Sequence, residues 1–312
     1  MIQISISSKR LLMIGLLIGL IIAAPPAVAL IVGSSFAFAL GKPDGVFDIA
    51  RFARICLQSA IVLLGLNIEM KEVITTGGMY LGVGALYILL ASGLGLFLAT
   101  LFGLSSTDRT LITSGTAICG GTAISSVSPL IGAKAEETAC ALGVVFLLNM
   151  IALVIFPWIG SVVELSQNQF GVWAALAIHD TSSVVGAAQT YGPQAAETAT
   201  IVKLTRTLWL IPLLLLLSFR FNQPGRRIQI PYFVLLFVIA SIIGSFTPLT
   251  MSVRTIISDA SHGLLVAALF FIGVQVDRTA ILTMGHRVLG HAVTLWLMLI
   301  PCALGIALVI ED

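Results

Sequence analysis

Charged residues are scarce in this sequence, and their scarcity decides the class of protein. Asp, Glu, Lys and Arg make up 10% of the 312 residues and apolar residues 58%, whereas soluble domains carry about a quarter charged residues. A bilayer solvates apolar side chains and requires only that backbone groups pair among themselves. The net charge of +2 is too small and scattered for a nucleic-acid surface. We therefore expect a lipid-embedded chain with no nucleic-acid partner.

Motifs for metals, disulfides and nucleotides are also missing. The four cysteines stand singly and none has CxxC spacing, so we expect neither a metal site nor a disulfide framework. They are Cys56, Cys119, Cys140 and Cys302. No Walker A motif is present, which excludes direct drive by ATP through that fold. We expect no cofactor and no enzymatic activity.

Apolar runs close to the ~20 residues that cross a bilayer recur along the whole chain. They predict an all-α, polytopic membrane protein, one transmembrane domain over residues 1–312 with about eleven spans. The predicted spans are 8–24, 27–41, 51–67, 75–102, 109–130, 137–161, 173–190, 196–218, 230–248, 256–275 and 287–310. The first resembles a signal peptide, but further spans follow at once, so we interpret it as an uncleaved helix. The Pro25-Pro26 pair also allows the first two runs to form a tight hairpin.

Lysine and arginine favour one side of these spans, which predicts a cytoplasmic N-terminus. The loops on that side hold Lys9, Arg10, Lys42, Arg51, Arg54, Arg109, Arg220, Arg226, Arg227, Arg278 and Arg287. The opposite loops hold Lys71, Lys134 and Arg254.

The sequence also contains an internal echo. Residues 63–71 resemble residues 270–278, and the preceding spans, 26–41 and 231–248, match loosely. In the predicted topology the two copies point in opposite directions. Inverted repeats of this kind are typical of secondary transporters, so we expect repeat halves at 26–161 and 173–310.

One span, at residues 113–129, is rich in glycine and hydroxyl residues and carries no charge. Its Gly-Gly pair weakens a helix, since each glycine costs ~1 kcal/mol against alanine. A break there frees backbone N–H groups, which an anion at a half-helix N-terminus satisfies. The candidate substrate-binding residues of this segment are Thr116, Cys119, Gly120, Gly121, Thr122, Ser125 and Ser126. The alternative is close helix packing through small residues.

Two further groups place charge within apolar runs. His179-Asp180 predicts a proton relay or ion site, or else a helix end that Asp180 caps. Lys203 and Arg206 share one helical face at a depth where cations are costly. Either Asp180 and Glu197 compensate them, or a transported anion does, and we list both cations as substrate-binding candidates. Asn149 lies mid-span and fits an interhelical hydrogen bond better than a ligand role.

These segments resemble the YeiH-like family of bacterial membrane proteins, whose members are named as sulfate exporters. The resemblance covers residues 11–310. It is carried by Ser114–Ile124, His179-Asp180 with Val184-Val185, Val202–Arg206 with Ile211-Pro212, the Gly273 region and Ile230-Pro231. It implies a multi-pass protein of the bacterial inner membrane, related in architecture to cation/proton antiporter and bile-acid transporter folds. Asp180 stands where the family pattern leads us to expect Glu, which shortens the reach of that carboxylate.

Together these features predict a secondary transporter that exports or exchanges a small inorganic or organic anion, sulfate by the resemblance. A proton or sodium ion is the expected coupling ion, carried at His179-Asp180. The first alternative is a cation/proton antiporter, in which Asp180 binds the cation and Lys203 competes for it. An intramembrane enzyme and a channel are weaker alternatives, and a homodimer is kept open.

Overall fold

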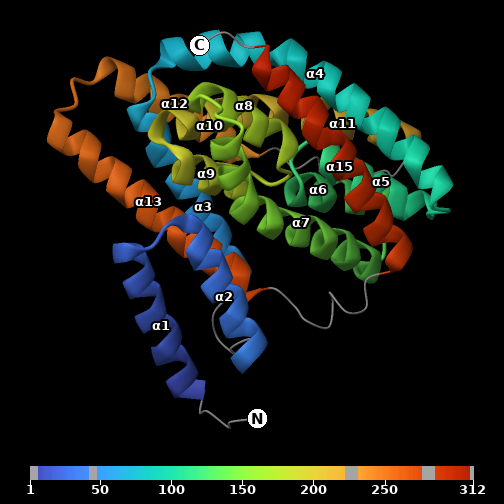
Figure 1. Ribbon diagram of the computed structural model, residues 1–312, viewed down its shortest axis with the longest axis horizontal. Helices are drawn as coiled ribbons and strands as arrows, with labels where there is room; N and C mark the ends of the chain where they lie inside the picture. The colour runs from blue at the N-terminus through green and yellow to red at the C-terminus, as the bar shows by residue number, and fades with distance from the viewer. Residues whose placement is uncertain (1–5, 42–47, 222–230, 276–284, 310–312) are drawn as a thin grey trace. The chain divides into compact units, whose positions relative to one another are not determined.

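The computed structural model describes residues 6–41, 48–221, 231–275 and 285–309, and within these ranges every regular element is a helix (Figure 1). The all-α prediction is therefore confirmed. The helices are α1 (Ile6–Ala23), α2 (Pro26–Leu40), α3 (Ile49–Asn67), α4 (Met70–Leu101), α5 (Ser106–Ala117), α6 (Gly121–Ile131), α7 (Ala135–Val162), α8 (Gln167–Ala177), α9 (Thr181–Tyr191), α10 (Pro193–Leu208), α11 (Leu210–Phe221), α12 (Tyr232–Phe246), α13 (Met251–Val274) and α15 (His286–Leu308).

Membrane-crossing length is met by six apolar helical stretches of the described chain: α3, α4, α7, α10 with α11, α13 and α15. Four shorter apolar helical segments accompany them, at Leu11–Ile22, Pro26–Leu40, Gly121–Ile131 and Tyr232–Phe246. Each predicted span falls on a helix or on two successive helices. The protein is thus a polytopic membrane protein, while the count of eleven spans and the cytoplasmic N-terminus stay predictions.

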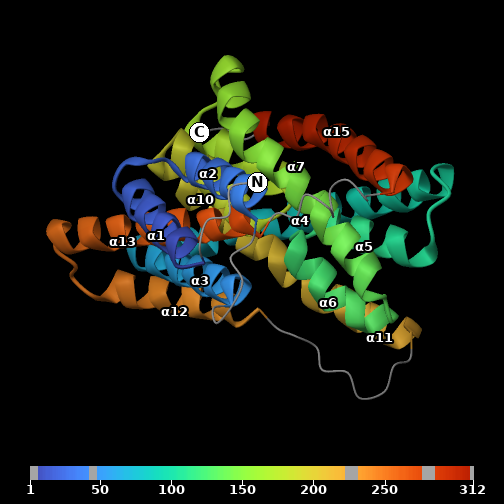
Figure 2. The ribbon, with the colours of Figure 1, turned by 90° about the horizontal axis from the view of Figure 1, so that it is seen from below.

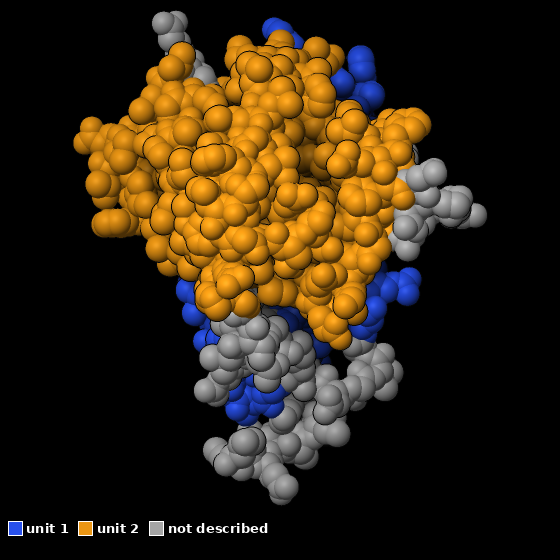
Figure 3. Space-filling view, turned by 90° about the vertical axis from the view of Figure 1, so that its right-hand side faces the viewer, with its two compact units in different colours: residues 1–73, 232–278 blue, residues 74–231, 279–312 orange. Residues whose placement is uncertain are grey.

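The chain divides into two compact units, coloured separately in Figure 3. Unit 1 takes residues 1–73 and 232–278, and unit 2 takes residues 74–231 and 279–312. Each unit thus draws helices from both predicted repeat halves. The repeat itself stays a prediction, and residues 276–278 of the echo lie outside the described residues.

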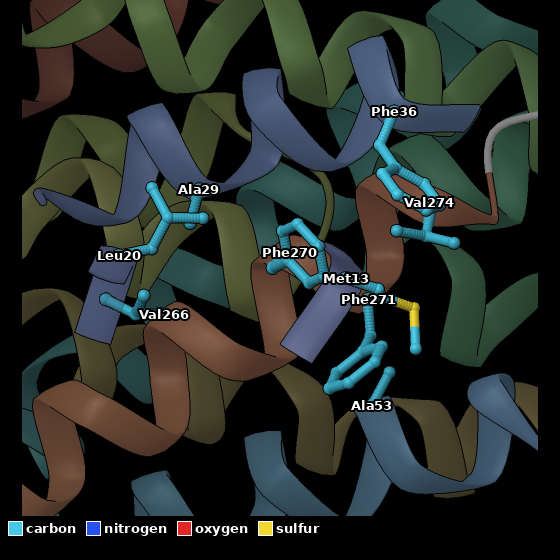
Figure 4. Close-up of a cluster of buried hydrophobic side chains, with 9 residues drawn as sticks. All are labelled: Met13, Leu20, Ala29, Phe36, Ala53, Val266, Phe270, Phe271 and Val274. Atoms are coloured by element: carbon cyan, nitrogen blue, oxygen red, sulfur yellow. The ribbon is translucent and has the colours of Figure 1, made fainter. Parts of the chain in front are cut away.

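Unit 1 is held together by α13, which packs against both α2 and α3. Its apolar core is shown in Figure 4, where Phe270 and Phe271 of α13 lie among side chains from α1, α2 and α3. Phe52 of α3 meets Phe271 edge-on, with ring centroids 5.1 Å apart. This packing buries the apolar faces of four helices against one another.

Glycines let the helices of unit 1 approach to backbone contact, and they do so in two related places. A Cβ on Gly273 would lie 2.4 Å from the carbonyl oxygen of Leu30, and one on Gly65 would lie 2.9 Å from that of Phe237. Gly65 and Gly273 are the glycines of the two echoed segments. The echo therefore marks equivalent close contacts, α13 with α2 and α3 with α12.

Unit 2 contains the helices from α5 to α11, most of α4, and α15. Figure 2 labels several of them, among them α5, α6, α7 and α15. Its helix starts carry local signals: Ser105 accepts from the backbone of Asp108, and Ser166 and Gln169 form a capping box. Pro193 occupies the first turn of α10, where its missing N–H is not needed. These caps fix where the interrupted helices of the candidate site begin.

Replacing Gly33 by alanine is expected to destabilise the protein, because the added Cβ would lie 2.1 Å from the carbonyl oxygen of Phe270. Overpacking of this kind costs about 1–3 kcal/mol. Gly19→Ala is the matched control, since nothing lies within 4 Å of a Cβ there. Thermal unfolding in detergent should show a lower melting temperature for Gly33→Ala alone. Equal melting temperatures for both variants would contradict the close contact.

Candidate functional site

The helix predicted over residues 109–130 is interrupted at its glycine pair. α5 ends at Ala117, α6 begins at Gly121, and Gly120 between them has φ 57°. That left-handed conformation suits glycine because it has no Cβ. The predicted break within two residues of Gly120 is confirmed.

A second break divides the span expected over 173–190, at the segment where a helix end capped by Asp180 was one of the two alternatives. α8 ends at Ala177 and α9 begins at Thr181. Asp180 is the N-cap of α9: its carboxylate accepts from the backbone N–H of Ser182 at 3.1 Å and from the Ser182 hydroxyl. The cap that one alternative expected at Asp180 is therefore present, while a role of His179-Asp180 as proton relay or ion site stays a prediction.

The two breaks touch each other inside unit 2. A Cβ on Gly120 would lie 3.2 Å from the backbone nitrogen of Asp180 and 3.3 Å from the Cβ of His179. We call residues 118–120 and 178–180 together the crossing. Four half-helices end there, the C-termini of α5 and α8 and the N-termini of α6 and α9. Their terminal backbone groups lack the partners of a continuous helix.

The C-terminal carbonyls of α8 are satisfied by cations of α10. Lys203 is fully buried, and its Nζ donates to the carbonyl oxygens of Ile178 at 2.6 Å and Ala175 at 3.3 Å. Arg206 Nη1 donates to Leu176 at 2.6 Å and also to Ala175 at 3.1 Å. The carbonyl of Ala177, which lies between Leu176 and Ile178 in the chain, accepts from the indole N–H of Trp296 on α15 at 3.0 Å.

Arg206 also binds the end of α5, so that one guanidinium joins both broken helices. Its Nε donates to the carbonyl of Ile118 at 2.6 Å and its Nη2 to that of Thr116 at 3.2 Å. The guanidinium lies over the ring of Tyr87, 5.4 Å from its centroid. This placement confirms the prediction that both cations point into the protein interior.

The expected pairing of the cations with Asp180 is not found among the described residues, while compensation by a transported anion stays a prediction. In the described part of the chain neither Lys203 nor Arg206 forms an ion pair with Asp180; backbone carbonyls take that place. A cation at a helix C-terminus is stabilised by the helix dipole, which explains how two cations tolerate full burial.

The N-terminus of α9 is also provided with acceptors. Besides the Asp180 cap, Oδ1 of Asn149 on α7 accepts from the backbone N–H groups of His179 at 3.1 Å and Asp180 at 3.3 Å. The expected interhelical hydrogen bond of Asn149 is confirmed, with backbone as its partner. Sequence reasoning had no signal for this partner, because the contact joins residues about 30 positions apart and depends on the tertiary fold.

The N-terminus of α6 is different. Its N-cap, Gly120, offers no side-chain acceptor, and the N–H groups of Gly121 and Thr122 have no acceptor among the described residues. Cys119 is fully buried, and its sulfur interacts with the N–H of Ala123. Whether that thiol lines a transport cavity stays a prediction.

The remaining candidate site residues lie on α5, on α6 and at the crossing. Thr122 is half-buried, Ser125 is exposed and Ser126 is buried. The buried hydroxyl of Thr116 and both ring nitrogens of buried His179 have no hydrogen-bond partner within the described ranges. Unpaired buried polar atoms are rare in native proteins and call for a ligand or water. Among described residues no group of three His, Cys, Asp or Glu side chains is placed to hold a metal ion.

Removing the Arg206 side chain is expected to destabilise the protein, because Arg206→Leu leaves buried carbonyls unpaired at roughly 1–3 kcal/mol each. Arg206→Lys should fall between, since an ammonium lacks the planar fork that reaches both broken helices. Arg220→Leu, at the exposed end of α11, is the control. Melting temperatures in detergent should rank Arg220→Leu, Arg206→Lys, Arg206→Leu from high to low. An Arg206→Leu variant as stable as the control would contradict this role.

Comparison with known proteins places the chain in a family. Residues 11–292 match the family model described as Conserved hypothetical protein 698. A UPF0324 membrane protein of Photobacterium profundum is 42% identical over 94% of this chain and 90% of its own length. One from Bdellovibrio bacteriovorus is 37% identical, over 91% and 89%. No solved structure matches the chain. The chain therefore belongs to the UPF0324 membrane proteins, the same family as the YeiH-like proteins that its motifs resemble.

Proposed function

We propose that the protein is a secondary transporter of the bacterial inner membrane that exports or exchanges a small anion, with sulfate as the first candidate. One observation carries the proposal. Three of the four half-helix ends at the crossing have side-chain partners, whereas at the fourth, the N-terminus of α6, the N–H groups of Gly121 and Thr122 have no acceptor within the described chain. An anion is the natural partner of free N–H groups at a helix N-terminus.

Charge at the crossing supports an anion rather than a cation. By formal charge Lys203 and Arg206 bring +2 and Asp180 brings −1, which leaves a formal +1 among the side chains that bond there. In a buried site of low dielectric such an excess attracts an anion strongly. The two cations supply charge through space, since their hydrogen bonds go to carbonyls. Direct ligands are the N–H groups of Gly121 and Thr122 and the hydroxyls beside them.

Interrupted helices support a transporter. Discontinuous membrane helices whose half-helix ends meet substrate and coupling ions are typical of secondary transporters. In the proposed cycle His179 and Asp180 bind the coupling proton or sodium ion next to the anion, because both adjoin Gly120. Binding of the two ions at adjoining places is what couples their movements.

The decisive experiment uses purified protein in proteoliposomes. Uptake of labelled sulfate, other anions and sodium is measured under imposed pH gradients. We expect saturable sulfate uptake that a pH or sodium gradient accelerates. Sodium uptake driven by a pH gradient, without anion uptake, would instead establish the cation/proton antiporter. Uptake of neither ion above protein-free vesicles would reject both.

Removing the Thr122 hydroxyl is expected to weaken sulfate transport. Thr122→Val keeps the shape and deletes one donor beside the free N–H groups, so KM for sulfate should rise about tenfold or less, in line with ~1 kcal/mol per hydrogen bond. Thr110→Val is the control, because that hydroxyl bonds the carbonyl of Ser106 within α5. Equal KM values for the two variants would exclude Thr122 as a ligand.

A further inference from the structure

Asn149 is placed to decide which sign of charge the crossing accepts. It comes from α7, it is 2% exposed, and its Oδ1 accepts from two successive backbone N–H groups of the second break. That arrangement fixes the orientation of the amide, because only its oxygen can accept. The other end of the amide, Nδ2, is buried and has no acceptor among described residues.

A carboxylate would fill the same position as well as the amide does. An Asp side chain has the same shape as Asn, and a carboxylate accepts from backbone N–H groups more strongly than an amide oxygen. The hydrogen bonds to His179 and Asp180 therefore give no reason for an amide at this place. What the amide adds is a neutral charge and a free Nδ2 donor.

Both properties favour an anion. With Asn149 neutral, the formal charges of Lys203, Arg206 and Asp180 leave a net +1 at the crossing. A carboxylate at this position would bring the sum to zero and replace an unpaired donor by an acceptor. We infer that Asn149 is the residue that determines charge selectivity, by keeping the crossing net positive and by directing an N–H donor to a bound oxyanion. This inference rests on the proposed function.

The test is Asn149→Asp in proteoliposomes with labelled sulfate. Asn168→Asp is the matched control. Asn168 lies near the start of α8, away from the crossing, and its amide oxygen accepts from the Thr198 hydroxyl. We expect Asn149→Asp to retain the wild-type melting temperature within a few degrees, because its acceptors persist. Its sulfate uptake should fall about tenfold or more, as a new charge in a buried site requires. Asn168→Asp should transport as the wild type does.

A pH profile separates charge from structural damage. Once the introduced carboxyl is protonated it is neutral and again offers a donor, so uptake by Asn149→Asp should recover on acidification relative to the wild type. The wild-type profile accounts for the titratable groups that adjoin the position, namely His179, Asp180 and Lys203. Recovery supports the inference, and uptake that stays low at every pH in a folded variant overturns it.

The outcomes distinguish this inference from the proposed function. A wild-type protein that transports no anion refutes the function, whereas an active wild type with an equally active Asn149→Asp refutes the selectivity role alone. If Asn149→Asp does not fold, Asn149→Ser replaces it, because serine keeps a neutral acceptor and donor. Folded Asn149→Ser should retain sulfate uptake, and its complete loss would overturn the assignment.

Discussion

The two helix breaks leave backbone N–H and C=O groups without helical partners, and the need to pair these groups determines which side chains unit 2 places around them. A membrane interior has no water for them, so each end needs a partner from the protein or from a ligand. Arg206 meets most of this need, since its guanidinium donates to carbonyls at the ends of both α5 and α8. Lys203 and Trp296 complete the end of α8. The guanidinium thus stabilises both breaks at once.

This arrangement explains why such costly residues occupy a buried helix. A cation is unfavourable deep in a membrane, and so is an unpaired backbone carbonyl. A hydrogen bond from the cation to the carbonyl reduces both costs. At the N-terminus of α9 the roles are reversed, because Asp180 and Asn149 supply acceptors for backbone N–H groups. The N-terminus of α6 stands out because, in the described chain, the N–H groups of Gly121 and Thr122 have no acceptor and the Cys119 sulfur interacts with that of Ala123 alone. The proposed anion site follows from this asymmetry.

Parts of this structure could be predicted from local sequence. Long apolar runs give the membrane helices, and Gly120-Gly121 gives the first break, since glycine weakens a helix wherever it stands. For the second break the local sequence offered only the capping alternative at Asp180. Ala174 to Ala177 is helix-favouring sequence and forms the last turn of α8. The break follows at residues 178–180 and is held by tertiary contacts from Asn149, Trp296 and the α10 cations. The burial of Arg206 was likewise predictable on energetic grounds, whereas its backbone partners were not, because carbonyls leave no mark in a sequence.

The central claim is that an anion completes the N-terminus of α6. Selenate, an analogue of sulfate with a strong anomalous signal, tests it directly in crystals of the protein. The account predicts an anomalous peak within hydrogen-bond distance of the backbone nitrogens of Gly121 and Thr122, with Arg206 still bound to its carbonyls. A peak bound directly to Arg206 and Lys203, or none in unit 2 under conditions where sulfate is transported, would contradict it.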